Sequence, residues 1–121
     1  MPFIAAHPIG ATDITALPVK EVAPAIAFYV NCLGFALVGK TATTAQVKRD
    51  AVVLGLAVNG ADPDQASVYV HVDQLETLHL EYRSKLLYPT PIGPSSHAGR
   101  EYRVFWAKEP YGVCFCFGLP I

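Results

Sequence analysis

Apolar and polar residues in the first half of the chain follow first the spacing of a strand and then that of a helix. Residues 13–20 alternate in the manner of a strand. A helical spacing of apolar residues begins near Pro24 and continues to Leu33, and Gly34 follows where a glycine commonly ends a helix. Three further strands are predicted at residues 35–40, 44–49 and 51–58. The last strand is almost wholly apolar, which is typical of a strand covered on both faces.

The same order of elements returns after a turn-rich segment at residues 59–65, which we interpret as a linker. Residues 67–72 alternate as a strand, and a helix with an apolar stripe is predicted from Asp73 to about Leu87. Residues 88–99 are rich in proline, glycine and serine and show no regular pattern. Two strands are predicted near the end of the chain, at residues 101–107 and 113–117.

The two halves also match residue by residue. A shift of 53 positions pairs similar side chains that should face the core: Val19 with Val72, Val22 with Leu75, Tyr29 with Tyr82, Leu33 with Leu86 and Phe35 with Tyr88. These matches predict an α+β fold of two βαβββ modules that form curved mixed sheets, each module too small to bury its own face. We expect a single domain over residues 1–121, with modules at 12–58 and 66–118, a linker at 59–65 and an N-terminal arm at 1–11.

The composition supports one domain and excludes several functions. A chain of 121 residues and 13.0 kDa can bury about two-thirds of its surface, which is enough for one core. Apolar residues make up 52% and charged residues 16% of the chain, which excludes disorder as the main state. So much apolar surface suggests that a second protomer covers part of it. The net charge is -1 and the basic residues are scattered, which argues against nucleic-acid binding.

The cellular location is predicted from what the sequence contains. Apolar stretches fall short of a membrane span, and residues 1–10 lack the pattern of a signal peptide, so we expect a cytoplasmic protein without a membrane partner. The cysteines are Cys32, Cys114 and Cys116. The last two would lie about 7 Å apart on one face of a strand, too far for a disulfide, so reduced thiols are expected.

Two segments resemble the glyoxalase/bleomycin resistance/dioxygenase superfamily, also called the vicinal oxygen chelate proteins. Residues 17–35, LPVKEVAPAIAFYVNCLGF, are similar to its first strand and helix with the closing Leu-Gly-Phe. Residues 103–112, RVFWAKEPYG, are similar to its Arg-x-Phe-x-x-x-Asp-Pro-x-Gly turn, with Glu109 in place of the usual Asp. The resemblance extends from residue 12 over nearly the whole chain and is more specific for the fold than for the activity.

Enzymes of this superfamily place a metal ligand, His or Glu, on each of four inward strands. The resemblance carries these positions to Ile14, Gly55, Ser67 and Cys116, none of which is His, Asp or Glu. Such a set lacks the charge and the ligand count of a divalent metal site, so we expect no metal and no other cofactor. This departure indicates the metal-free branch represented by the bleomycin resistance protein, whose members are homodimers that sequester a drug in clefts at the subunit interface.

The match to that branch is incomplete. Its drug-stacking aromatic residues correspond to Thr44 and to Glu101, or Ala98 in the shifted register, and none of these is aromatic. Tyr69 falls where the branch has a tryptophan. The branch is acidic whereas this chain is nearly neutral, so attraction of a cationic drug would be weak.

Strand alternation predicts a ligand-binding face. Ser67, Tyr69 and His71 share one face, and Gly55 in the other module would leave room for a bulky ligand. Four further candidates complete the predicted site. Phe28 could point toward a groove, Arg103 could reach an acidic ligand group, Trp106 is either a platform or helix-packing core, and Cys116 lies at an inward position.

Three functions remain open from the sequence. The first is a homodimeric, metal-independent drug-binding protein that sequesters a bulky, partly aromatic, antibiotic-like compound and confers antibiotic resistance or serves transport. The second is a superfamily enzyme, of the lyase, isomerase or dioxygenase kind, with a non-standard site such as Tyr69, His71 and Arg103. The third is a protein-interaction module. In a dimer, the apolar arm at residues 1–11 could cross to the other protomer, because its own chain offers nothing obvious to cover it.

Overall fold

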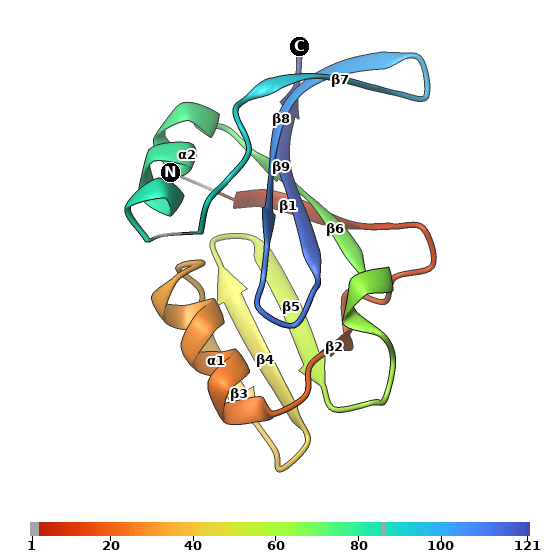
Figure 1. The fold of residues 1–121 in the computed structure, drawn as a ribbon, viewed down its shortest axis with the longest axis vertical. Coiled ribbons are helices and arrows are strands. Elements are labelled where there is room, and N and C mark those ends of the chain that lie inside the picture. Colours follow the sequence, from red (N-terminus) through yellow and green to blue (C-terminus); the bar gives the residue numbers. More distant parts are fainter. Residues whose placement is uncertain (1–2, 86) are drawn as a thin grey trace.

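Two mixed sheets, each with one helix packed on it, make up the structure (Figure 1). The computed structural model describes residues 3–85 and 87–121. Its elements are β1 (Phe3–Ile9), β2 (Leu17–Pro18), α1 (Val22–Asn31), β3 (Ala36–Lys40), β4 (Thr44–Arg49), β5 (Val52–Ala57), the short 3-10 helix η1 (Pro63–Gln65), β6 (Ser67–Val72), α2 (Leu75–Ser84), β7 (Gly93–His97), β8 (Arg100–Lys108) and β9 (Cys114–Pro120).

The two sheets repeat one topology. The four-stranded sheet has the order β2-β5-β4-β3, and four strands of the other sheet have the equivalent order β6-β9-β8-β7. In both sheets the first strand pairs in parallel with the last, and the remaining pairs are antiparallel. The predicted α+β fold of two βαβββ units is therefore confirmed. The two helices lie on the same side of the molecule (Figure 1).

The core is built from the helix-facing positions of both sheets. Val68, Val70 and Val72 are buried along β6, in keeping with the alternation that predicted this strand. Tyr29 of α1 and Tyr82 of α2, which the sequence repeat pairs, are both fully buried. The hydroxyl of Tyr82 donates a hydrogen bond of 2.9 Å to the carbonyl of Leu33, whereas the hydroxyl of Tyr29 has no partner among the described residues.

A side-chain clamp joins the two modules. Arg49, at the end of β4, donates to the carbonyl of Leu33 and makes a two-pronged ion pair with Glu81 of α2 at 2.8 and 3.0 Å. Its guanidinium also lies over the ring of Phe3 in β1, 4.3 Å from the ring centroid. Gly34 has a positive φ of 82° and gives the guanidinium its space, because a Cβ at this position would collide with it. The clamp therefore fixes both modules and the first strand to one another.

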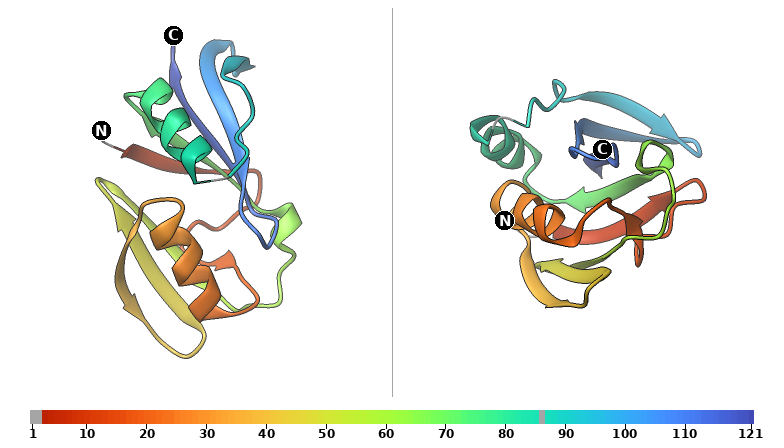
Figure 2. Two further views of the ribbon diagram at one scale, coloured as in Figure 1. Left: turned by 60° about the vertical axis from the view of Figure 1, so that its left-hand side comes forward. Right: turned by 60° about the horizontal axis from the view of Figure 1, so that its bottom comes forward.

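Strand β1 corrects an assumption about the N-terminal arm. It pairs in antiparallel fashion with β6 of the same chain and forms the edge of a five-stranded sheet (Figure 2). Phe3 is fully buried, and its backbone is held by the carboxylate of Asp50 and the amide of Ala51. The assumption that the arm's own chain offers nothing to cover the arm is therefore wrong. Strand β6 and residues 50–51 cover it, and no pattern in the sequence indicated that they pair with the arm.

Other differences concern element boundaries. Only Leu17–Pro18 of the predicted strand 13–20 is a strand, because the carboxylate of Asp13 accepts bonds from Thr15 and closes a turn. The segment 88–99 contains a strand, β7, that its proline and glycine content concealed. None of the helices in the described part of the chain is long and apolar enough to cross a membrane.

Candidate ligand-binding face

The five-stranded sheet has one face under helix α2 and one face free of helices. Phe105 and Phe117 contact Tyr82 of α2 through their rings, so the residues that alternate with them point to the opposite side. We call this surface the open face. Its positions in the cross-strand register are Ala5, His7, Ile9, Ser67, Tyr69, His71, Gly93, Ser95, His97, Arg100, Tyr102, Val104, Trp106, Lys108, Cys114, Cys116, Gly118 and Pro120.

A row of aromatic rings crosses the open face. The rings of His7 and Tyr69 are nearly parallel with centroids 6.3 Å apart, and Tyr102 meets Tyr69 edge-on at 5.8 Å. Gly118 lies beneath Tyr69, and a Cβ at Gly118 would lie 3.3 Å from the Tyr69 ring and 2.6 Å from Val104. Glycine therefore lets the ring lie flat across β9. Trp106, 37% exposed, extends the aromatic surface along β8.

The hydroxyl of Tyr69 is the most unusual polar atom on this face. It is buried and has no hydrogen-bond partner among the described residues, which is costly unless another group satisfies it. Burial raises the pKa of Tyr69 to about 12, so the hydroxyl keeps its proton at neutral pH and can donate it in a hydrogen bond. Burial likewise raises the pKa of Cys116 to about 12, which leaves that thiol a poor nucleophile.

Five of the predicted site residues lie together on this face. Ser67, Tyr69 and His71 project from β6, and the register places Cys116 of β9 between Tyr69 and Trp106. Of the two alternatives for Trp106, helix-packing core is wrong, because its neighbour Phe105 contacts α2 and Trp106 points the other way. The platform alternative is the one compatible with this orientation.

Three predicted site residues lie elsewhere. Arg103 alternates with the open-face residues of β8 and makes an ion pair with Glu76 of α2, which lowers the pKa of that carboxyl group. Phe28 is half-buried on α1, edge-on to Tyr29. Gly55 offers no room for a ligand, because the carbonyl of Thr15 occupies the space where its side chain would be. The combination of Tyr69, His71 and Arg103 considered for an enzyme is therefore not assembled on one face.

Sequence reasoning missed two contributors, His7 and Tyr102. His7 stacks on Tyr69 only because β1 pairs with β6, and the arm carried no pattern from which this pairing could be read. Tyr102 lies on the same face of β8 as Trp106. The alternation along residues 101–107 contained this signal, but it did not say whether that face is covered by a helix.

The positions that carry metal ligands in related enzymes do not fit a metal here. Ile14 offers its backbone carbonyl to the amide of Gly55 at 2.9 Å, and Ser67 and Cys116 lie on the open face. These donors include one thiol and no imidazole or carboxylate, which is too few for a divalent cation. Within residues 3–85 and 87–121, no group of three or more His, Cys, Asp or Glu side chains is placed to hold a metal ion.

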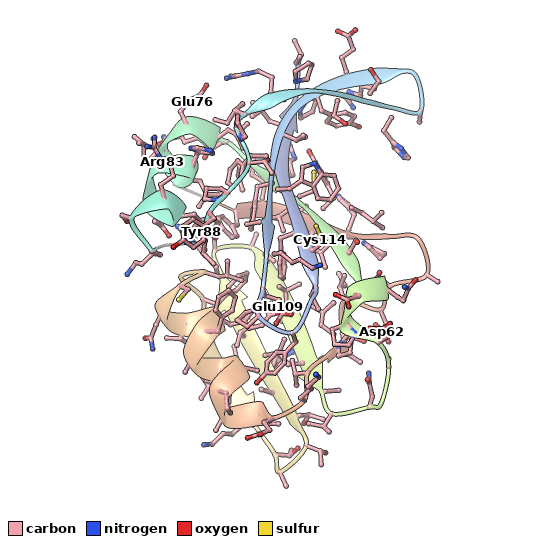
Figure 3. The ribbon with its side chains drawn as sticks, in the orientation of Figure 1. Asp62, Glu76, Arg83, Tyr88, Glu109 and Cys114 are labelled. Carbon is pink, nitrogen blue, oxygen red and sulfur yellow. The ribbon has the colours of Figure 1, made fainter. Side chains whose placement is uncertain are left out.

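Two shallow hollows lie away from the open face. One, of about 510 Å³, is bordered by His79 and Arg83 of α2 and by Tyr88, and the other, of about 690 Å³, lies between the start of α1 and residues 40–43. Neither includes a residue of the aromatic row. Figure 3 shows Glu76 and Arg83 on α2, to the left of the sheet, while Cys114 lies on β9.

The family of the chain is settled by comparison with known proteins. The model of the Glyoxalase/Bleomycin resistance protein/Dioxygenase superfamily matches residues 11–117. The chain belongs to this superfamily. The predicted resemblance is thus confirmed, and the match spans both βαβββ units of this superfamily member. No curated protein matches the sequence significantly.

Solved structures with the same fold include proteins of different description. A bleomycin-binding protein from bleomycin-producing Streptomyces verticillus, complexed with copper(II)-bleomycin, has a TM-score of 0.70 at 23% identity, covering 90% of this chain and 95% of that one. A superfamily member from Alicyclobacillus acidocaldarius has a TM-score of 0.75 at 13% identity, covering 88% of each chain. A virulence protein from Salmonella typhimurium has a TM-score of 0.74 at 16% identity, covering 93% and 98%. At these identities the likeness shows the fold alone.

Proposed function

We propose that this protein binds a bulky, partly aromatic, antibiotic-like small molecule without a metal and sequesters it unchanged, in the cytoplasm. The observation that carries the proposal is the aromatic row of His7, Tyr69, Tyr102 and Trp106 on the open face. Flat rings held by a rigid sheet offer a stacking surface, and the unpartnered hydroxyl of Tyr69 offers a directed donor. The bleomycin-binding neighbour supports a ligand of this size class.

We further propose that the protein is a homodimer, and that the second copy covers the open face of the first and so forms a cleft. Apolar side chains are exposed on the four-stranded sheet, where Leu37, Val38 and Val53 are 42%, 56% and 42% exposed. Exposed apolar side chains on a sheet commonly mark an interaction surface. A second copy that covers these side chains could also exchange strand β1, so that Phe3 of one chain lies against the guanidinium of Arg49 of the other.

A ligand screen that uses Trp106 as the reporter tests the binding proposal. Trp106 is the only tryptophan of the chain, so its fluorescence reports directly on the open face. Glycopeptide, enediyne and quinone-type antibiotics are titrated into the purified protein, and the melting temperature is measured in parallel. We expect at least one class to quench Trp106 saturably and to raise the melting temperature by mass action, and to be recovered unchanged after release.

Two variants control this screen. Tyr69→Ala removes the central ring and should weaken binding about tenfold or more, whereas Tyr88→Ala removes a ring that is 82% exposed outside the open face and should leave binding unchanged. Conversion of the compound would favour an enzyme instead. Stoichiometric zinc, iron, manganese or nickel in the purified protein would contradict a metal-independent site.

A further inference from the structure

The charges on the open face are all of one sign. Its ionisable side chains other than thiols and phenols are His7, His71, His97, Arg100 and Lys108. The only carboxylate in the five strands is Glu101, which alternates with Arg100 and points to the helix side. The two formal charges on the strands of this face, Arg100 and Lys108, are therefore both positive, although the net charge of the whole chain is -1.

Arg100 is the cation best placed to act on a ligand at the aromatic row. Lys108 already has a carboxylate partner, Asp64 at 3.4 Å, whereas the described residues give Arg100 no ion-pair partner within 4.0 Å. Arg100 lies two positions before Tyr102 on the same face of β8, and the ring of Tyr102 meets that of Tyr69 edge-on at 5.8 Å, so Arg100 and Tyr69 lie on either side of Tyr102. In keeping with this placement, the positive charge of Arg100 lowers the pKa of the Tyr69 hydroxyl, partly offsetting the effect of burial. The buried Tyr69 hydroxyl is a donor without an acceptor. A ligand group that accepts hydrogen bonds from both the Tyr69 hydroxyl and the Arg100 guanidinium binds most strongly when it is negatively charged.

The open face of the other sheet has the same sign. Its strands β3, β4 and β5 contain no carboxylate, and Lys48 occupies an open-face position opposite Val53. If a second copy covers the aromatic row with this sheet, it therefore adds positive charge and removes none. The charge pattern on both sheets disfavours a cationic ligand, in line with the near-neutral composition noted above.

We propose that the molecule bound on the open face is an aromatic anion, whose ring lies against Tyr69 and Trp106 and whose carboxylate or equivalent acidic group accepts hydrogen bonds from Tyr69 and Arg100. This inference rests on the proposed binding function and names the chemical class of its ligand. Hydrogen bonds to a charged acceptor are stronger than those to a neutral one. The charge of an aromatic ligand, rather than the shape of its ring, would therefore decide which ligand binds most tightly.

Three probes that share one ring test the inference. Naphthoate, naphthamide and naphthylmethylammonium carry the same ring with a negative, a neutral and a positive group, and their dissociation constants are measured from Trp106 fluorescence. We expect naphthoate to bind about tenfold more tightly than the other two. Added salt should narrow this difference, because screening weakens the charge-dependent part.

Matched variants locate the origin of the preference. Arg100→Gln should bring naphthoate and naphthamide to similar affinity, whereas Arg83→Gln, which removes the same charge from α2, should leave the preference intact. Equal binding of all three probes, or a preference for the ammonium, would overturn the anion inference and leave the proposed binding function standing. Failure of all three probes and of the antibiotic panel would refute the binding function itself.

Discussion

The two modules have the same topology and similar cores but different open faces. In the second module, β6, β8 and β9 carry Tyr69, Tyr102 and Trp106, with Cys116 between them. In the first module the corresponding positions of β4 and β5 carry Thr44, Gln46, Lys48, Val53 and Gly55, and none is aromatic. A duplicated fold therefore fixes where side chains project, while the choice of residue at the projecting positions decides which copy can hold a ring.

Gly55 shows why the first module cannot simply be given a binding face. By strand register it corresponds to Cys116, since Leu56 pairs with Leu17 and Phe117 pairs with Val70 in equivalent parallel ladders. The turn at residues 13–16 covers Gly55, whereas strand β6 leaves Cys116 facing the aromatic row. The space that a ligand would occupy in one module is filled by backbone in the other.

The largest expected effect is that of a side chain at Gly55. Gly55→Ala should lower the free energy of unfolding by about 1–3 kcal/mol, because its Cβ would collide with the carbonyl of Thr15 and backbone must move. Gly39→Ala is the matched control, since nothing lies within 4 Å of a Cβ at that position of β3. Urea denaturation of both variants measures the difference. Equal stability of the two would show that the 13–16 turn yields easily and that the first module can open.

A smaller difference should separate the paired core tyrosines. Tyr82→Phe removes the donor to the Leu33 carbonyl and should cost about 1 kcal/mol, since a buried hydrogen bond is lost while Arg49 still contacts that carbonyl. Tyr29→Phe removes a hydroxyl without a described partner and should be neutral or stabilising. Thermal or chemical unfolding of the two variants measures the difference in their free energies of unfolding. A loss of stability in Tyr29→Phe as large as in Tyr82→Phe would show that the Tyr29 hydroxyl has a partner in solution.

The sequence predicted the core better than the face. The 53-residue shift found Tyr29 and Tyr82, and both are fully buried, because burial leaves a periodic signature that repeats with the fold. In β8, by contrast, both alternating rows contain large or buried apolar side chains between charged ones: one contains Tyr102, Val104 and Trp106, and the other contains Phe105 and Ala107. The alternation of residues shows which side chains of β8 share a face, but it does not show which of the two faces helix α2 covers. That choice depends on long-range packing, as does the pairing that brings His7 onto Tyr69.

The turns between the last two strands of each module also differ in burial. In the first module Asp50 lies in a short exposed turn, whereas in the second Glu109 is buried between β8 and β9 (Figure 3). One carboxylate oxygen of Glu109 accepts from the amide of Val113, and the other has no partner among the described residues. Burial raises the pKa of Glu109, although the nearby backbone amides of residues 111–113 oppose the rise.

This raised pKa predicts the smallest effect, which depends on pH. Because the folded protein holds the proton of Glu109 more tightly than the unfolded chain, its stability should fall as the pH rises above the ordinary value of 4.5 and through the folded-state pKa. Glu109→Gln cannot ionise and keeps an acceptor for Val113, so its advantage over the natural protein should grow from about pH 4 to about pH 8. A stability difference for Glu109→Gln that stays constant or shrinks over this range would mean that the amides of the turn outweigh burial in setting the pKa of Glu109.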